Sequence, residues 1–202
     1  MNVKGMFDVI RGKVRYDQGK GACFGRREGG DIDAVFLLED GVTLKQNVVS
    51  GANQAEGVHY QGFCNIYNVW LEDVCEDGII LCQTSGTTNI VGRGAKNARN
   101  NIIQHKGGGA VNVSSYCVQD FGKLYRTCGN CNTQYKRVVN INDVIAKNGK
   151  VMVGINSNFG DVATSKNNQF RGVSSVCDTF QGNTNGKEPT TLTVNKANTK
   201  YV

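Results

Sequence analysis

The feature that most constrains the fold of this 202-residue chain is a loose repeat in its apolar residues. Segments such as AVFLLEDGVTLKQNVVSG (34–51) and RVVNINDVIAKNGKVMVGINSN (137–158) carry short apolar stretches that Gly, Asn or Asp interrupt. Comparable valines recur at spacings of 20, 22, 27 and 26 residues, at Val49, Val69, Val91, Val118 and Val144. Such periods are typical of solenoids, in which each coil buries its inner face against the next.

The content of each repeat indicates strands rather than helices. Apolar and polar residues often alternate, and the chain has 26 glycines but one proline, a composition that favours short strands joined by tight turns. We predict an all-β fold, a right-handed single-stranded parallel β-helix, in which Asn47, Asn68 and Asn89 stack at recurring turns. The same pattern leaves an antiparallel sandwich or barrel as the alternative architecture.

We expect a single domain over residues 1–202. The irregular, charged residues 1–30 are expected to cap the open end of the stack, and residues 178–202, which hold Pro189, to form a terminal coil and tail. No segment approaches the apolar length that crosses a bilayer. Eight cysteines favour an oxidising compartment over buried free thiols, so we expect a secreted protein, with its signal removed or with the given chain a fragment.

The Cys128-Gly129-Asn130-Cys131 motif has three possible interpretations. A structural zinc site needs a second ligand pair, but the chain has no second CxxC and only His59 and His105 as histidines. No βαβ pattern surrounds the motif, which argues against a thioredoxin-like role. We therefore predict a disulfide that pins a loop.

Charged residues of opposite sign gather in neighbouring repeats. Glu56 lies 20 residues before Glu76, and Asp77 follows directly. Residues one coil apart lie side by side in a solenoid, so these carboxylates can share a Ca²⁺ site; a solvated acidic edge is the alternative. Basic residues follow downstream, at Lys96, Arg99, Lys106, Lys123 and Arg126.

This order of charges suits an anionic sugar, whose carboxylates a metal and cationic side chains would bind together. The net charge of +6 agrees with a polyanionic partner. Only 8% of the residues are aromatic, which argues against a nucleic-acid partner because such sites stack bases on exposed rings.

Several motifs in order resemble the family 3 polysaccharide lyases, which are secreted pectate lyases. The similar segments run from about Asp31 to Asp161 and are AVFLLEDGVTLK, GANQAEGVH, VWLEDVCEDG, GRGAKNA, QHKGGGAVNV and FGKLYRTCGNCNTQYKR. The resemblance implies a parallel β-helix, Ca²⁺ dependence and β-elimination of polygalacturonate (pectin). We expect a monomer with neither a membrane nor a nucleic-acid partner.

The resemblance also implies roles for individual residues. Glu56, Glu76 and Asp77 match the calcium positions of the family. Lys123 and Arg126 match its basic pair, which would grip substrate carboxylates, and Arg126 would assist proton removal. Lys96 is a further candidate for substrate binding.

The chain departs from the family pattern at two places. Asn101 stands where members usually have a lysine that is a leading candidate for the catalytic base, and an amide cannot accept the proton. Arg99 would face the same side as Asn101 if this stretch is extended, so Arg99 or Arg126 is predicted to replace that lysine. Cys82 also stands where the family often has a lysine. Members usually have a cysteine directly after the histidine that matches His59, but this chain has Tyr60 there, so Cys64 lacks that partner. Cys82 could pair with Cys64 instead.

Three functions remain open from these residues. The first is an active lyase, and the second is a weakened or inactive pectin-binding relative that has lost its base. The third is a polygalacturonase-like hydrolase, which would need an acid/base pair of carboxylates.

Overall fold

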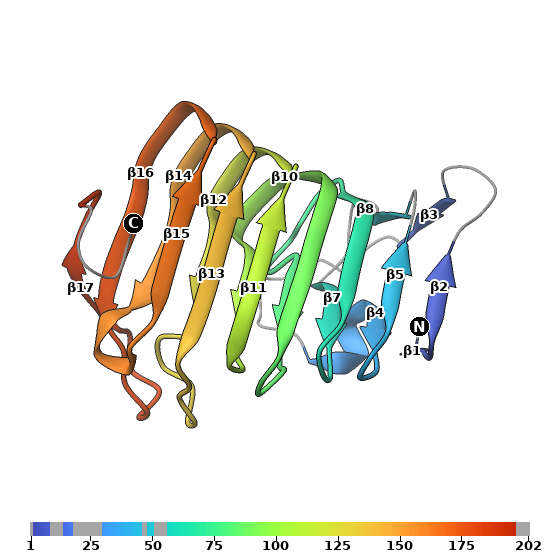
Figure 1. Cartoon of the computed structure of the whole chain (residues 1–202), viewed down its shortest axis with the longest axis horizontal. Coiled ribbons are helices and arrows are strands. Elements are labelled where there is room, and N and C mark those ends of the chain that lie inside the picture. The colour runs from blue at the N-terminus through green and yellow to red at the C-terminus, as the bar shows by residue number, and fades with distance from the viewer. Residues whose placement is uncertain (1, 9–13, 18–29, 46–47, 51–55, 197–202) are drawn as a thin grey trace.

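The computed structural model describes residues 2–8, 14–17, 30–45, 48–50 and 56–196. This part of the chain consists of strands and two short 3-10 turns, without an α-helix. Figure 1 shows the coils stacked in sequence order along the long axis of the molecule. Every strand pair is parallel except β16 with β17. The predicted parallel β-helix is therefore confirmed, and the antiparallel alternatives are excluded.

The strands of the N-terminal half are short. They are β1 (Asn2–Val3), β2 (Met6–Asp8), β3 (Val14–Tyr16), β4 (Ala34–Leu38), β5 (Thr43–Lys45), β6 (Val48–Ser50), β7 (Glu56–Tyr60), β8 (Asn65–Leu71) and β9 (Ile79–Leu81). The 3-10 turn η1 (Asp31–Asp33) precedes β4. Strands β1, β2 and β3 pair in parallel with β4, β5 and β6, so the described residues of the 1–30 segment extend the stack.

The strands of the C-terminal half are longer. They are β10 (Thr87–His105), β11 (Gly109–Ser114), β12 (Cys117–Thr127), β13 (Arg137–Asn142), β14 (Ile145–Asn156), β15 (Val162–Lys166), β16 (Gln169–Gln181) and β17 (Thr190–Thr193). The turn η2 (Ser157–Phe159) lies between β14 and β15. Among the described residues, no helix is long and apolar enough to span a membrane.

The register of the strands explains the repeat in the sequence. Equivalent residues of successive coils lie beside one another in the column Ile79, Ile103, Tyr125, Val153 and Cys177. Their separations of 24, 22, 28 and 24 residues set the length of each coil. Side chains one coil apart in the sequence therefore meet in space.

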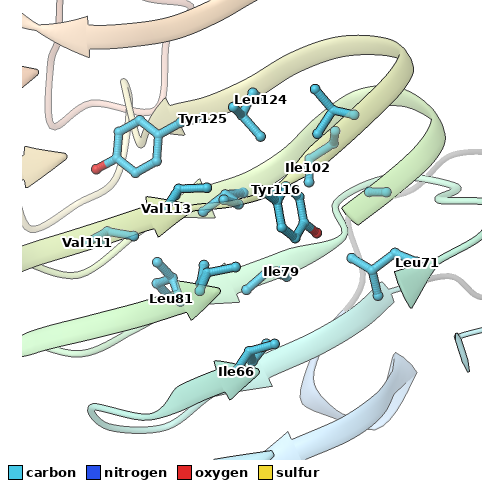
Figure 2. Close-up of a cluster of buried hydrophobic side chains, with 14 of the residues drawn as sticks. Ile66, Leu71, Ile79, Leu81, Ile102, Val111, Val113, Tyr116, Leu124 and Tyr125 are labelled. Carbon is cyan, nitrogen blue, oxygen red and sulfur yellow. The ribbon is translucent and has the colours of Figure 1, made fainter. Parts of the chain in front are cut away.

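The core is a column of apolar side chains inside the coils, as the close-up in Figure 2 shows. Strand β11 illustrates its origin, because Val111 and Val113 are buried while Asn112 between them is only partly so. Tyr116, Tyr125 and Leu124 fill the same interior in neighbouring coils. Alternation in sequence thus becomes an inner and an outer face on each strand.

Asparagine side chains add a second column of contacts. Asn89, Asn112 and Asn140 each donate from Nδ2 to the Oδ1 of the equivalent Asn one coil earlier, at 2.9, 3.0 and 2.9 Å, beginning at Asn65. Asn68 instead lies within β8, at a left-handed position with a φ of 58° that asparagine tolerates better than most residues. Asn47 lies outside the described residues.

Candidate functional site

The stacking of coils brings charged residues into one column. Asp77, Asn101 and Lys123 each lie two residues before the aligned set Ile79, Ile103 and Tyr125, and Asn101 is the register partner of Lys123. Gln104 pairs with Arg126 in the same way. The coil length therefore places a carboxylate (Asp77), an amide (Asn101) and an amine (Lys123) beside one another in three successive coils.

These residues line a pocket of about 500 Å³. Its acidic end holds Glu76 and Asp77, and its basic side holds Lys106, Lys123 and Arg126. The other lining residues are Asn100, Asn101, Gln104, Cys128, Gly129, Asn130, Cys131, Asn132, Glu188 and Pro189. The structure thus brings four of the predicted site residues together: Glu76, Asp77, Lys123 and Arg126.

The acidic end is held by Asn100 and Asn101, the second of which departs from the family pattern. Asp77 is only 3% exposed, and its Oδ1 accepts hydrogen bonds from the backbone N–H and Nδ2 of Asn101, at 3.2 and 2.9 Å. Asn100 Nδ2 donates to Glu76 Oε1 at 2.5 Å. Asn101 Oδ1 is buried and has no hydrogen-bond partner among the described residues. Adjacent carboxylates with an unpartnered amide oxygen form a donor set suited to Ca²⁺.

The third predicted ligand is only partly placed. The backbone of Glu56 begins strand β7, but its side chain lies outside the described part of the structure. The N–H of the next residue, Gly57, donates to the carbonyl of Asp77 at 3.3 Å, so this backbone lies in the coil beside Asp77. Among the described residues, no three His, Cys, Asp or Glu side chains lie close enough together to hold a metal ion.

Lys123 is half-buried in the pocket wall. Burial, followed by the positive charge of Arg126, lowers the pKa of Lys123 below its ordinary value. The negative charge of Asp77, which lines the same pocket, partly opposes this lowering of the pKa of Lys123. A lysine of lowered pKa beside carboxylates has the properties of a general base.

Arg126 is 7% exposed and rigidly held. Its Nη1 donates to Asn156 Oδ1 at 3.0 Å and to Thr127 Oγ1 at 3.2 Å, and its guanidinium carbon lies 3.9 Å from the centroid of the Phe180 ring. Burial lowers the pKa of Arg126 to about 10, although Asp161 opposes the shift. A fixed guanidinium of this kind is suited to carboxylate binding.

Arg99 and Lys96 lie outside this pocket. Ala98 pairs with Phe121 but Asn101 pairs with Lys123, so β10 carries one extra residue relative to β12. This bulge breaks the alternation that would have placed Arg99 and Asn101 on one face. Arg99 is exposed and lines a neighbouring hollow with Asp120.

Lys96 takes part in a surface ion pair instead. Its Nζ lies 3.6 Å from Glu72 Oε1, and both side chains are about one-third exposed. The proposed roles of Lys96 and Arg99 stay predictions, but the structure does not bring either residue to the pocket of Lys123 and Arg126.

The cysteines follow the prediction in part. Cys128 and Cys131 form a disulfide, as predicted, and this short loop forms part of the pocket wall. The suggested pairing of Cys64 with Cys82 is wrong, since both are free thiols. Cys64 Sγ instead donates to the Glu39 carbonyl at 3.0 Å, and burial raises the pKa of Cys64 to about 11.

Sequence reasoning missed the residues that hold or enclose the basic side. Asn156 and Phe180 contact Arg126 from sequence positions 30 and 54 residues later. Glu188 and Pro189 enclose the pocket from the C-terminal segment. The coil length could have identified Asn156, because this residue follows Arg126 by about one coil. No local motif in the sequence identifies Glu188.

Comparisons with known proteins agree on one family. The family model described as pectate lyase matches residues 1–187. The chain is 51% identical over 190 residues to "Probable pectate lyase E" of Neosartorya fischeri, covering 93% of this chain and 73% of the relative. It is also 51% identical to "Pectate lyase E" of Emericella nidulans, covering 93% and 72%.

Solved structures extend the likeness to the fold. Pectate lyase PelI from Erwinia chrysanthemi in complex with tetragalacturonic acid matches with a TM-score of 0.74 at 25% identity, over 100% of this chain and 67% of that one. The catalytic domain of PelI matches with a TM-score of 0.76 at 24% identity, over 99% and 94% of the two chains.

Proposed function

This chain belongs to the pectate lyase family and is a polysaccharide lyase, and on that premise we propose that it cleaves polygalacturonate by Ca²⁺-dependent β-elimination. The observation that carries the proposal is the meeting of Glu76 and Asp77 with Lys123 and Arg126 in one pocket. We also propose that the protein acts outside the cell, on pectin, as a monomer.

Glu76 and Asp77 would hold the Ca²⁺ ion, with Asn101 Oδ1 as a further oxygen ligand and Glu56 as the predicted third carboxylate. The support is the buried, unpartnered Asn101 Oδ1 beside the Asp77 carboxylate. When bound, Ca²⁺ would neutralise the uronate carboxylate and make the adjacent C5 proton more acidic. Asn101 would then act as a metal ligand, in place of the catalytic base that the family's lysine would provide.

Arg126 would grip a substrate carboxylate. The hydrogen bonds and the ring contact that fix it all involve the charged guanidinium, so Arg126 stays protonated and is a poor base. Its hydrogen bonds use Nη1, and among the described residues Nη2 makes none. Nη2 is therefore available to donate a hydrogen bond to a substrate carboxylate.

We assign the role of base to Lys123, since Asn101 cannot accept a proton and Arg99 lies outside the pocket. Neutral Lys123 would take the C5 proton of the uronate through Nζ. The C5–H electron pair forms the C4–C5 double bond as the C4–O4 bond breaks, and the leaving O4 takes a proton from water. The lowered pKa of Lys123 increases the neutral fraction available at a given pH.

Ultraviolet absorbance of the unsaturated product from polygalacturonate tests this proposal. We expect a signal with Ca²⁺ that a chelator removes, and a rate that rises with pH as Lys123 loses its proton. Lys123→Met should lower kcat by about 10²- to 10⁴-fold, the usual contribution of a general base. Arg99→Ala is the matched control and should change kcat little, because Arg99 lines a different hollow.

Other outcomes would assign the function differently. Loss of activity in folded Arg99→Ala, with Lys123→Met still active, would return the role of base to Arg99. A folded wild-type protein that binds polygalacturonate without forming product would be the inactive pectin-binding relative, for which the replacement of lysine by Asn101 is the supporting observation. Saturated products that form despite a chelator would indicate a hydrolase.

A further inference from the structure

We propose that Glu188 is a specificity-determining residue that weakens the hold of Arg126 on a free uronate carboxylate and thereby lets a methyl-esterified sugar unit compete for that position. Glu188 belongs to the C-terminal loop, defined here as residues 182–189, which follows β16. The inference rests on the proposed function, because it concerns the substrate of the same pocket.

The C-terminal loop is fixed against the disulfide loop of Cys128–Cys131. The N–H of Asn183 donates to the carbonyl of Gly129 at 2.8 Å. Asn130 Nδ2 donates to the carbonyl of Gly186 at 3.3 Å, and Gln134 Nε2 donates to that of Asn183 at 3.0 Å. These bonds join segments about 50 residues apart in the sequence, so they define where the loop lies over the pocket.

Hydrogen bonds within the loop fix its own shape. Asn183 Nδ2 donates to the carbonyl of Lys187 at 2.8 Å, and the N–H of Lys187 donates to Asn185 Oδ1 at 3.1 Å. Glu188 follows directly after this closed turn. Its backbone position is therefore set by the turn.

Glu188 and Pro189 form the wall of the pocket next to Arg126. A Cβ placed on Gly129 would lie 2.5 Å from Pro189 Cγ and 2.7 Å from Arg126 Nη2, so the loop and the guanidinium meet across this glycine. The charge of Glu188 also acts on Arg126 and raises its pKa, against the larger effect of burial. Among the described residues, no hydrogen bond or salt bridge neutralises the Glu188 carboxylate.

Glu188 is separate from the acidic end of the pocket. Glu188 enters the pocket from the C-terminal loop, whereas Glu76 and Asp77 come from the coil that ends in β9, and the three form no metal-binding group among the described residues. A uronate carboxylate approaching Arg126 Nη2 would meet the like charge of Glu188. A methyl ester removes that repulsion and leaves a carbonyl oxygen that can still accept from Arg126.

The test is the binding of two oligomers to the whole chain in the presence of Ca²⁺. The probes are hexagalacturonate and its fully methyl-esterified form, with Kd measured by calorimetry for Lys123→Met with and without Glu188→Gln, so that the oligomers are not cleaved during the titration. We expect Glu188→Gln to bind the unesterified oligomer about two- to fivefold more tightly, the effect of one exposed charge contact. Its Kd for the esterified oligomer should not change.

Two controls separate a local effect from a change in net charge. Asp143→Asn removes the same charge at an exposed residue that does not line the pocket, and it should leave both Kd values unchanged. Glu188→Lys should change the ratio of the two Kd values in the same direction as Glu188→Gln, and by more. Salt on the order of 1 M should reduce both effects, since it screens charges beyond about 3 Å.

The outcomes are distinct for the two proposals. Equal changes for both oligomers, or no change for either, would overturn the assignment of Glu188. Altered discrimination without any unsaturated product from the wild type would overturn the lyase activity but support the assignment of Glu188 as a determinant of binding.

Discussion

Gly154 leaves the space that the side chain of Arg126 needs. A Cβ on Gly154 would lie 2.8 Å from Arg126 Cδ and 3.1 Å from Phe180 Cε2. We therefore expect Gly154→Ala to displace the guanidinium from both Asn156 and the Phe180 ring. The variant should lose about 1–3 kcal/mol of stability from overpacking, and kcat/KM on polygalacturonate should fall by about tenfold or more, the range of losing one charge-assisted contact.

A matched glycine separates the contact from a general effect of alanine. Among the described residues, no heavy atom lies within 4 Å of the equivalent Cβ on Gly30, so Gly30→Ala should keep wild-type kcat/KM and melting temperature. Wild-type kinetics in Gly154→Ala would show that the position of the Arg126 guanidinium does not limit the reaction.

The asparagine column stabilises the stack at the scale of the strands. Asn112 of β11 takes part in two of these hydrogen bonds, called rungs here. It donates to Asn89 and accepts from Asn140. Asn112→Ala removes both and leaves partly buried amides unpaired, which should cost about 1–3 kcal/mol. In a chain of this size that corresponds to a fall in melting temperature of roughly 2–4 °C per kcal/mol, measurable by circular dichroism.

Thr164 provides the comparison at the next rung of the column. Its Oγ1 donates one hydrogen bond, to Asn140 Oδ1 at 2.6 Å. Thr164→Val keeps the shape of the side chain and loses this bond alone, so its melting temperature should fall less than that of Asn112→Ala. An equal fall in both variants would show that the two rungs of Asn112 do not contribute separately.

The stability of the whole molecule should depend on pH through His105. Nε2 lies 3.1 Å from the carbonyl of Gly108, which can only accept, so Nε2 carries the proton and Nδ1 accepts from the Tyr125 hydroxyl at 2.7 Å. Burial, with a smaller effect of Arg137, lowers the pKa of His105 from 6.5 to about 3. The unfolded chain thus binds a proton more readily than the folded one.

This difference gives the sign of the dependence. The contribution of neutral His105 is complete above pH 6.5 and is lost as pH falls from 6.5 toward 3. Melting temperature should fall over this window, by an amount equivalent to a few kcal/mol, and His105→Gln should have a shallower slope. Parallel curves for the two proteins would assign the acid sensitivity to other groups.

The sequence predicted the fold class and four residues of the pocket, although the repeat alone left an antiparallel sandwich or barrel open and the resemblance to polysaccharide lyases favoured the β-helix. Short alternating stretches at spacings of 20 to 27 residues predict stacked coils, because each coil repeats the same local pattern. The same repeat places carboxylates and bases of neighbouring coils side by side, and the resemblance to polysaccharide lyases singled out Glu76, Asp77, Lys123 and Arg126 among them. The disulfide of Cys128 and Cys131 also followed from a local motif.

Only the tertiary structure decided which other residues reach that pocket. The bulge near Arg99 shifts one strand by a single residue, and with a period of two this changes the face on which the side chain lies. Asn156, Phe180 and Glu188 lie one or more coils from Arg126, and the coils vary from 22 to 28 residues. Small differences in coil length accumulate along the stack, so these contacts depend on register that no single repeat specifies.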